Sequence, residues 1–164
     1  MDEEIDQEMI ALLPRLRHFA LSLTANLQDA DDLVQATCER AIRNLDKWRR
    51  GSRLDSWMYR IAQNLHRNAY RDGRTRDRHL AVLEAEASIV PAEDQAYAHV
   101  LLGDVGEVID RLPAEQRSVL LLVAVEGRSY KEAADILSIP VGTVTSRLAR
   151  AREAIMRTME GQEP

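Results

Sequence analysis

Apolar residues recur every three or four positions along most of the chain, and no stretch alternates strictly between apolar and polar residues. This spacing is that of a helix face, so the sequence predicts an all-α protein. A first helix is expected over about residues 8–24, with Pro14 inside it, and a second begins after Asn26 and runs to about residue 45. The expected buried stripe of the second helix is Val34, Cys38, Ala41 and Leu45.

A basic loop and a third long helix follow. The loop covers about residues 46–55 and the helix about residues 56–76. Residues expected to face the core of this helix are Trp57, Ile61 and Leu65. Its opposite stripe is polar and basic and comprises Arg60, Asn64, Arg67, Arg71 and Arg74, at spacings that place them along one solvent-facing line.

The chain divides into two small domains. Residues 77–94 lose the strong periodicity and contain Pro91, which predicts a linker between a domain at 1–76 and another at 95–164. In the second domain a helix over about residues 95–112 precedes one that Pro113 opens and Gly127 closes. Ser129 and Glu132 then have the spacing of a capping box, which predicts a helix over residues 130–137.

The last two helices have the outline of a helix-turn-helix. Residues 138–142 are expected to form the turn, and the final helix to run to about residue 159. Its inward positions are Val144, Leu148, Ala151, Ile155 and Met159, and its outward positions include Thr143, Ser146, Arg147, Arg150 and Arg157. Arginines there can pair with guanine edges or with phosphates, although a two-helix hairpin with a merely polar surface has the same pattern.

Composition excludes several classes of protein. The chain has 164 residues, of which 45% are hydrophobic, enough for one or two packed cores. The single cysteine, Cys38, permits neither an internal disulfide nor a thiolate zinc site, so a small core residue is expected there. The longest apolar run, at 119–125, is far shorter than the roughly 20 residues of a membrane span, and the N-terminus is acidic. We expect a cytoplasmic protein without membrane insertion.

Residue types that carry catalysis are scattered. His18, His66, His79 and His99 form no ligand pair at helical spacing, and the sequence has no glycine-rich phosphate loop or nucleophile motif. We therefore expect no enzyme, no cofactor and no metal site.

The net charge of −5 hides a strong alternation along the chain. Residues 1–39 carry a net charge of −7, residues 40–79 a net +8, residues 80–127 a net −7 and residues 128–164 a net +1. A block with eight excess positive charges matches the electrostatic footprint of a polyanion-binding protein. A solvated arginine-rich helix face has the same composition, so charge has to be joined to motif.

Two blocks of motifs carry a resemblance to a known family. The first is DDLVQ at 31–35, continued by SWMYRIAQN at 56–64, and the second is LPAEQR at 112–117, SYKEAA at 129–134 and PVGTV at 140–144, followed by SRL at 146–148. In this order they resemble the extracytoplasmic-function (ECF) sigma factors, the small two-domain specificity subunits of bacterial RNA polymerase. The similarity covers about 140 of the 164 residues.

The resemblance implies a polymerase-binding face on the second helix. Its residues Asp31, Asp32, Gln35 and Glu39 would dock on the clamp helices of the largest catalytic subunit of core RNA polymerase, and the flap of the second large subunit is a further implied partner. The two aspartates also suit the positive end of the helix dipole, and both interpretations can hold together. The family usually carries an acidic and then a bulky apolar residue where this chain has Ala36 and Thr37, which leaves the face itself in place.

The resemblance also implies two promoter-binding surfaces. The minus-ten element would be read as an opened strand by Trp48, Arg49, Arg50, Ser52, Arg53, Arg60, Asn64, Arg67, Arg71 and Arg74. Captured bases need polar or aromatic pockets beside a positive track, which suits these residue types. Trp57 fits either core packing or stacking on DNA. The minus-thirty-five element would be read as duplex by Thr143, Ser146, Arg147 and Arg150.

Regulation and two other functions stay open at this point. The family is typically held inactive by an anti-sigma factor, so such a partner is implied. The same fold could serve as a sigma-like decoy that sequesters an anti-sigma factor, or as an ordinary helix-turn-helix regulator. The acidic and basic blocks also raise the hypothesis that the domains mask each other in the free protein, because opposite charges attract.

Overall fold

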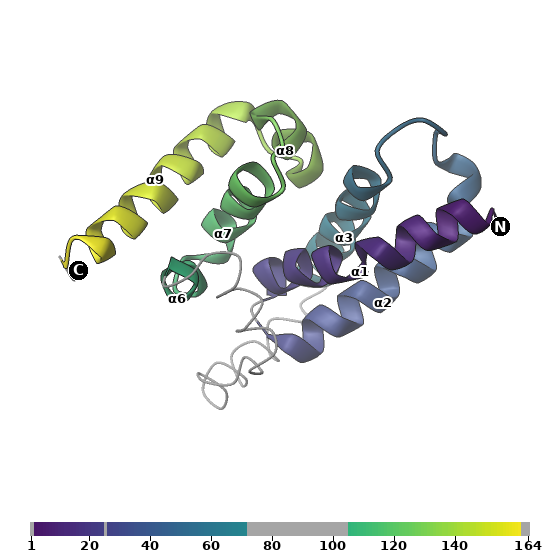
Figure 1. Cartoon of the computed structure of the whole chain (residues 1–164), viewed down its shortest axis with the longest axis horizontal. Helices are drawn as coiled ribbons and strands as arrows, with labels where there is room; N and C mark the ends of the chain where they lie inside the picture. Colours follow the sequence, from purple (N-terminus) through teal and green to yellow (C-terminus); the bar gives the residue numbers. More distant parts are fainter. Residues whose placement is uncertain (1, 25, 72–104, 162–164) are drawn as a thin grey trace.

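Every regular element is a helix in the part of the chain described by the computed structural model, residues 2–24, 26–71 and 105–161 (Figure 1). The predicted all-α class is therefore confirmed. The elements form two modules. The first contains α1 (Glu3–Thr24), α2 (Leu27–Arg43), the 3-10 turn η1 (Leu45–Lys47) and α3 (Leu54–Arg71). The second contains α6 (Val105–Asp110), α7 (Ala114–Leu120), η2 (Leu121–Val125), α8 (Tyr130–Leu137) and α9 (Val141–Met159).

The first module is a three-helix unit in which α1, α2 and α3 all contact one another. Asn26 starts α2 as predicted, because its side chain accepts a hydrogen bond from the backbone N–H of Asp29 at 2.8 Å. Phe19 and Tyr59 are fully buried at the centre, with their ring centroids 4.8 Å apart. Leu16 on α1 and Met58 on α3 complete this part of the core.

The register of the buried stripes differs from the prediction. On α2 the buried side chains are Ala30, Leu33, Thr37 and Ala41, whereas the predicted Val34, Cys38 and Leu45 are only half-buried. On α3 the buried side chains are Leu54, Met58, Tyr59 and Ala62, whereas the predicted Trp57, Ile61 and Leu65 are half-buried against the edge of the core. The reason on α3 is that it is covered on two sides, by α1 and α2 and by α8, which turns the buried stripe by one position.

Three helix bounds also differ from the prediction, among them the start of α3, which lies at Leu54 instead of about residue 56. Helix α1 begins at Glu3, five residues before the predicted start, with Pro14 inside it. Helix α2 ends at Arg43, where Asn44 caps it and the tighter turn η1 takes over.

In the second module the helices begin and end at the residues that the sequence predicted for these roles. Pro113 precedes α7, and Gly127 has a positive φ of 65° just after the π-helical turn η2, which replaces the end of the predicted continuous helix. Ser129 caps α8 by accepting a hydrogen bond from the N–H of Glu132 at 3.0 Å. Ser138 then adopts a left-handed conformation that ends α8.

Helix α9 packs along most of the predicted face. Val144, Leu148 and Ala151 are buried, while Ile155 is half-buried and Met159 is exposed, because the end of α9 runs beyond the helices that cover it (Figure 1). The prediction that Met159 faces the core is therefore wrong.

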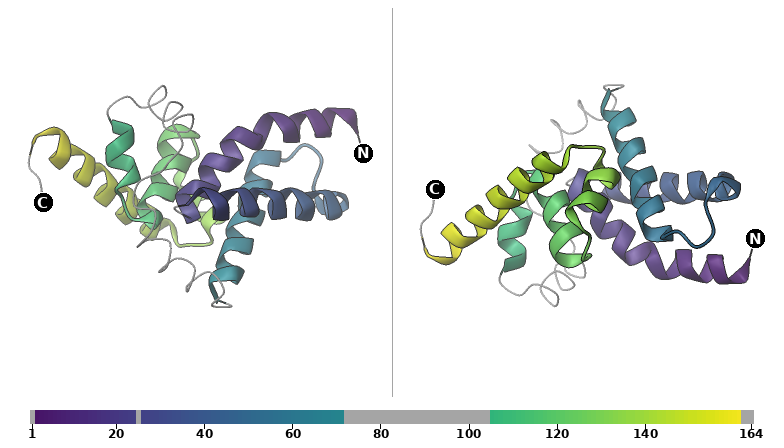
Figure 2. Two further views of the ribbon diagram at one scale, coloured as in Figure 1. Left: turned by 90° about the horizontal axis from the view of Figure 1, so that it is seen from below. Right: turned by 90° about the horizontal axis from the view of Figure 1, so that it is seen from above.

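The two modules pack against each other, as the views in Figure 2 show. Helix α1 contacts α7, and α3 contacts α8. The buried apolar residues of both modules form one cluster. The start of α1 and the end of α9 lie at opposite ends of the molecule (Figure 1). The predicted linker at 77–94, the first ten residues of the helix predicted at 95–112, and Arg74 lie outside the described residues.

Candidate functional site

Helix α2 presents the four residues expected to bind polymerase on one exposed face. Asp31, Asp32, Gln35 and Glu39 are all exposed. Their contacts lie within the first module: Asp31 accepts a hydrogen bond from Arg17 of α1 at 2.8 Å, and the amide of Gln35 donates to Glu39 at 3.2 Å. The residues form a surface of carboxylates and one amide, which suits a basic partner.

The loop between α2 and α3 carries half of the residues expected to bind the minus-ten element. Arg49, Arg50 and Ser52 are exposed, and the Ser52 hydroxyl donates to the carbonyl of Arg49 at 2.6 Å, which closes the turn. Arg50 makes an ion pair with Asp2 at the start of α1. Trp48 is half-buried against the core, and its indole N–H has no hydrogen-bond partner among the described residues.

Helix α3 carries the basic stripe. Arg60, Asn64, Arg67 and Arg71 are all exposed, which agrees with the solvent-facing side expected from their spacing. Trp57 is half-buried against the core and stands two helical turns before Asn64, so it lies beside the stripe on the same side of α3. The four exposed side chains form a polar and positive line that runs down α3.

Of the four residues of α9 expected to bind DNA, two are exposed and two are half-buried. Ser146 and Arg150 are exposed, and the Ser146 hydroxyl donates to the carbonyl of Thr143 at 3.1 Å. Thr143 is half-buried. The side chain of Arg147 is only 26% exposed, and its Nη2 lies 3.6 Å from Oε2 of Glu115 on α7. Arg147 therefore faces back across its own module rather than into open solvent.

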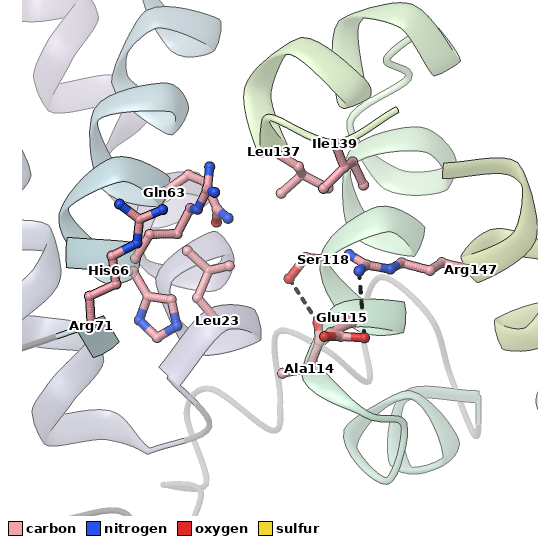
Figure 3. A pocket seen from close by; sticks show the side chains of 11 residues that line it. Leu23, Gln63, His66, Arg71, Ala114, Glu115, Ser118, Leu137, Ile139 and Arg147 are labelled. Carbon is pink, nitrogen blue, oxygen red and sulfur yellow. Dashed lines mark hydrogen bonds and ion pairs between the residues drawn. The ribbon is translucent and has the colours of Figure 1, made fainter. Parts of the chain in front are cut away.

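A cleft of about 500 Å³ lies between the modules and is lined by residues of both expected DNA-binding surfaces (Figure 3). Arg67 and Arg71 of α3 line one side, and Arg147 of α9 lines the other. Leu23, Leu137 and Ile139 add apolar surface, and Glu115 contributes a carboxylate. In this arrangement Arg67 and Arg71, although exposed, lie across the cleft from Arg147, so the parts of the two surfaces nearest the module boundary face each other.

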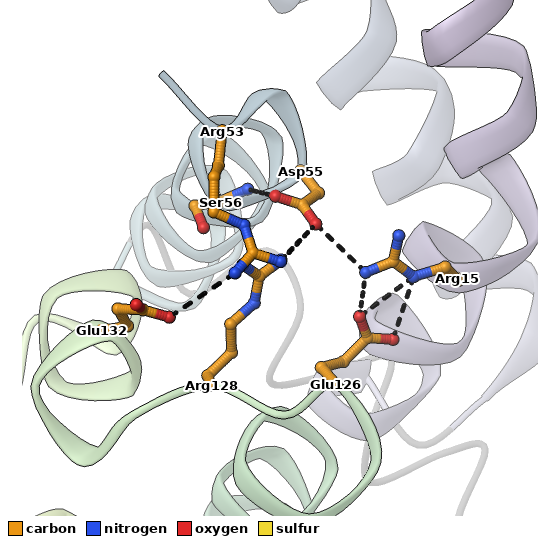
Figure 4. Close-up of polar contacts among 7 residues, drawn as sticks. All are labelled: Arg15, Arg53, Asp55, Ser56, Glu126, Arg128 and Glu132. Atoms are coloured by element: carbon orange, nitrogen blue, oxygen red, sulfur yellow. Dashed lines mark hydrogen bonds and ion pairs between the residues drawn. The ribbon is translucent and has the colours of Figure 1, made fainter. Parts of the chain in front are cut away.

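A cluster of charged side chains joins the modules on another part of their boundary (Figure 4). We call Arg15, Asp55, Glu126 and Arg128 the inter-module cluster. Arg15 Nη2 lies 3.1 Å from Asp55 Oδ2, and Arg15 Nε donates to Glu126 Oε2 at 3.0 Å. Arg128, just before α8, makes an ion pair with Asp55 at the start of α3. Arg53 extends the cluster, with its Nη2 3.3 Å from Asp55 Oδ2 and its Nη1 3.9 Å from Glu132 Oε2.

Burial sets the electrostatics of this cluster. The side chain of Arg128 is 0% exposed and that of Asp55 is 15% exposed. The guanidinium carbon of Arg128 lies 5.8 Å from the centre of the Tyr59 ring, within the range of a cation–π contact. Burial alone would raise the pKa of Asp55, but the hydrogen bond and charge of Arg128 outweigh it, and the pKa is lowered. The hydrogen bond to Glu126 raises the pKa of Arg15.

Sequence reasoning missed the inter-module cluster. Its members stand 40 to 111 positions from their partners, as the pairs of Arg15 with Asp55 and with Glu126 show. No periodic pattern links residues at such separations, and a single arginine between Gly127 and Ser129 has the composition of an exposed loop. The one available signal was the general alternation of acidic and basic blocks.

Among the described residues no three histidine, cysteine or carboxylate side chains are grouped so that they could hold a metal ion. Burial raises the pKa of the Cys38 thiol, which disfavours a reactive thiolate. Over the same residues no helix is long and apolar enough to span a bilayer.

Comparison with known proteins matches both modules to one family. A family model described as sigma-70 region 2 matches residues 9–76, and one described as sigma-70, region 4 matches residues 102–155. The ECF RNA polymerase sigma factor EcfG of Rhodopseudomonas palustris (strain TIE-1) is 37% identical over 158 residues, which cover 94% of this chain and 84% of that protein.

Solved structures share the fold. The sigma factor RpoE from Bartonella quintana, solved in complex with the anti-sigma factor NepR, matches with a TM-score of 0.72 and 32% identity, and covers 99% of this chain and 100% of its own. The anti-anti-sigma factor PhyR from Bartonella quintana, also solved with NepR, matches with a TM-score of 0.51 and 19% identity over 94% of this chain and 51% of its own. This second likeness is one of fold alone.

Proposed function

The chain belongs to the ECF sigma factors, a group within the sigma-70 family, and we propose that it binds core RNA polymerase and directs it to specific promoters. The observation that carries the proposal is that both modules expose basic side chains on the helix expected to read DNA. Arg60, Arg67 and Arg71 are exposed on α3, and Arg150 is exposed on α9. Arginines that neutralise phosphates supply a large share of the affinity of such proteins for DNA.

Polymerase binding is proposed for the exposed face of α2. A helix that offers Asp31, Asp32, Gln35 and Glu39 together favours a basic partner helix, and the clamp helices of the largest catalytic subunit are the proposed partner. The surface pairs within this face are exposed and weak, so a partner can displace them at little cost.

Reading of the minus-ten element is proposed for the loop after α2 and for the exposed stripe of α3. Asn64 can pair bidentately with a base edge, and it lies between Arg60 and Arg67 on the positive stripe. Arg49, Arg50 and Ser52 could wall a pocket for an extruded base beside Trp48. The arginines would hold the backbone of the opened strand while the polar residues select the base.

Reading of the minus-thirty-five element is proposed for α9, with Thr143 and Ser146 near its N-terminus and Arg147 and Arg150 one turn further on. Two promoter elements one and a half to two helical turns apart require modules that are roughly 50 to 70 Å apart. The packed modules with their shared cleft do not have this separation, so promoter binding requires that the modules move apart.

Control by an anti-sigma factor is proposed from the chemistry of the cleft. The relative RpoE was solved with such a partner. Here the cleft offers Arg67, Arg71 and Arg147 against the single carboxylate of Glu115, next to apolar side chains. A helix with an acidic face and an apolar face fits this lining.

A second candidate function is that of a decoy for an anti-sigma factor, because PhyR shares the fold. A decoy has no need of an exposed basic stripe on α3 or of an exposed acidic face on α2. Both are present here, which favours the sigma factor.

In vitro transcription tests the proposal. Purified core RNA polymerase is given a library of promoter fragments, with and without this protein, and transcript starts are mapped. New start sites that appear only with the protein are expected. If the protein does not bind core polymerase, the proposal is wrong and the decoy or the helix-turn-helix regulator takes its place.

The variant Asn64→Ala sharpens the same assay. We expect holoenzyme assembly to be unchanged and promoter opening to be impaired, because Asn64 is exposed and its proposed role begins with the opened strand. Permanganate footprinting of the minus-ten region measures opening, and co-elution with core measures assembly. A variant that failed to assemble would contradict the role assigned to Asn64.

A further inference from the structure

The boundary between the modules buries charged groups that water would otherwise solvate. The side chain of Arg128 is 0% exposed, although it belongs to the second module and its ion-pair partner Asp55 belongs to the first. Taking a guanidinium out of water is unfavourable unless it is paired. Arg128 and Asp55 can therefore stay paired and buried only while the modules remain packed together.

We propose that Arg15, Asp55, Glu126 and Arg128 form a latch that holds the free protein in a closed conformation, in which it cannot engage a promoter. This inference rests on the proposed function, because it names how access to the proposed DNA-binding surfaces is controlled. The closed conformation is the one described above, and the open one has the modules apart.

The first argument is the connectivity of the cluster. Arg15 of α1 contacts Asp55 in its own module, with Nη2 3.1 Å from Oδ2, and also contacts Glu126 of the second module, with Nε 3.0 Å from Oε2. Asp55 therefore makes two ion pairs, one with Arg15 of its own module and one with Arg128 of the second module. Two ion pairs of the cluster thus cross the boundary, Arg15 with Glu126 and Arg128 with Asp55, and the contact between Arg15 and Asp55 connects them, so separation of the modules breaks both at once.

The second argument is which surfaces the latch hides. When the modules are closed, Arg67 and Arg71 line the same cleft as Arg147, so these parts of the two expected DNA-binding surfaces are not free to meet separate promoter elements. Arg53 of the loop is drawn toward Asp55 and Glu132. The acidic face of α2 lies outside the boundary and stays exposed. The latch therefore restricts DNA binding and leaves the proposed polymerase face open.

The third argument is that the contact is suited to being broken. Nε and Nη1 of Arg128 are buried without a hydrogen-bond partner among the described residues, and only Nη2 meets a counter-charge, that of Asp55, so the burial of Arg128 is incompletely compensated. Ser22 and Ser118 meet nearby across the same boundary with their hydroxyl oxygens 3.4 Å apart, a small polar contact. Buried ion pairs of this kind contribute little net stability but are sensitive to loss of one partner. A binding partner can then shift the equilibrium between the closed and open conformations.

Distances between spin labels in the full-length protein test the latch. With Cys38 replaced by alanine, labels are placed through Asn68→Cys on α3 and Asp135→Cys on α8, two exposed positions on helices that contact each other across the module boundary. Pulsed electron resonance then gives the distribution of distances for the parent chain and for Arg128→Met, Asp55→Asn and the double variant. Arg157→Met is the matched control, because Arg157 pairs with Glu153 within α9 and is 61% exposed.

The parent chain and the Arg157→Met control should show one short, narrow distance. Each single latch variant should shift the closed-to-open ratio by at least about tenfold toward longer distances, because one buried charge is left without its partner. The double variant should lie closer to the parent chain than either single variant, since it leaves no unpaired charge of this couple. Unchanged distances in both single variants, or a long distance in the parent chain, would overturn the proposal.

Circular dichroism separates opening from unfolding. If Arg128→Met loses helix content, the label distances of Asp55→Asn are used in its place, because the amide keeps the shape of the carboxylate and is expected to leave the helices folded. Opening of the modules with native helix content supports the latch.

Binding to a 30-base-pair duplex of random sequence in dilute salt tests the masking. Apparent affinity falls in proportion to the population of the competent state, so latch variants should bind more tightly than the parent by about tenfold. Equal affinity in an opened variant would contradict masking. These readouts need no polymerase, so they can fail while the transcription assay succeeds, and the reverse.

Discussion

The exposed face of α2 and the inter-module cluster are built from the same kinds of charged residue, but the two sets are held in different ways. On α2 the partners are near in sequence or on the neighbouring helix, and they are exposed: Arg43 and Glu39 stand four positions apart, with 75% and 53% of their side chains exposed. In the cluster Arg128 is fully buried and its partner lies in the other module. Exposed pairs contribute about 0 to 1 kcal/mol, whereas breaking a buried pair is strongly unfavourable.

This difference in burial decides whether each set of charged residues can bind a partner protein. The weakly held charges of α2 can exchange their neighbours for those of a binding partner. The charges of the cluster are used to fix the position of one module against the other, and they cannot serve a partner until the modules separate. Four predictions test this difference, beginning with the buried inter-module cluster and ending with the exposed face of α2.

The largest effect on stability is expected from Arg128→Met. Loss of the Arg128 guanidinium leaves the partly buried Asp55 carboxylate without its main counter-charge, so the free energy of unfolding should fall by about 3 kcal/mol. Urea denaturation followed by circular dichroism measures the change, and Arg157→Met should stay within about 0.5 kcal/mol of the parent. A variant as stable as that control would mean that Arg128 is not energetically coupled to its surroundings.

Arg147→Ala should weaken binding to a duplex that carries the upstream element by about 1 to 3 kcal/mol if this arginine reads a base. The measurement is fluorescence anisotropy over a panel of single-base variants of that duplex. Arg152→Ala, exposed on the same helix, is the matched control. An equal loss on every sequence would make Arg147 a phosphate contact instead.

The contribution of Asp55 to stability should depend on pH. The pKa of Asp55 is lowered in the folded protein, because Arg128 and Arg53 outweigh the effect of burial, so the folded state binds the proton less well than the unfolded state. The difference in unfolding free energy between the parent and Asp55→Asn should be fully present above about pH 5 and should vanish as pH falls below the usual aspartate pKa of about 4 and through the lowered folded value. A difference that grew on acidification would have the wrong sign.

The smallest effect on stability is expected on α2. Asp32→Asn should change the free energy of unfolding by no more than about 0.5 kcal/mol, since Asp32 is exposed and its contact is a hydrogen bond from Gln28 at 3.3 Å. Its affinity for core polymerase should nevertheless fall by about fivefold or more. Surface plasmon resonance on immobilised core measures this affinity. A stability loss without a binding loss would reverse the comparison.

The sequence predicted the local features of the fold well. Caps such as Asn26 and Ser129 act on backbone groups two or three residues away, so their consequences are visible in a short window. The exposed sides of α2 and α3 were predicted for the same reason, because hydrophilic residues at helical spacing leave one face polar.

The features that failed depend on long-range packing. The buried stripe of α3 is offset by one position because α8 covers a second side of the helix, and nothing near residue 57 encodes that contact. Met159 was placed in the core because the pattern continues past the point where neighbouring helices end. The pairing of Arg128 with Asp55 is of the same kind, since its partners are 73 positions apart.

The central claim is that the free protein is closed and that its modules separate when it joins polymerase. The most direct measurement is the distance between labels at positions 68 and 135, in the free protein and in the complex with core RNA polymerase. The account predicts one short distance in the free protein and a distinctly longer one in the complex, where the modules would be set to span the two promoter elements. The same distance in both states would contradict it.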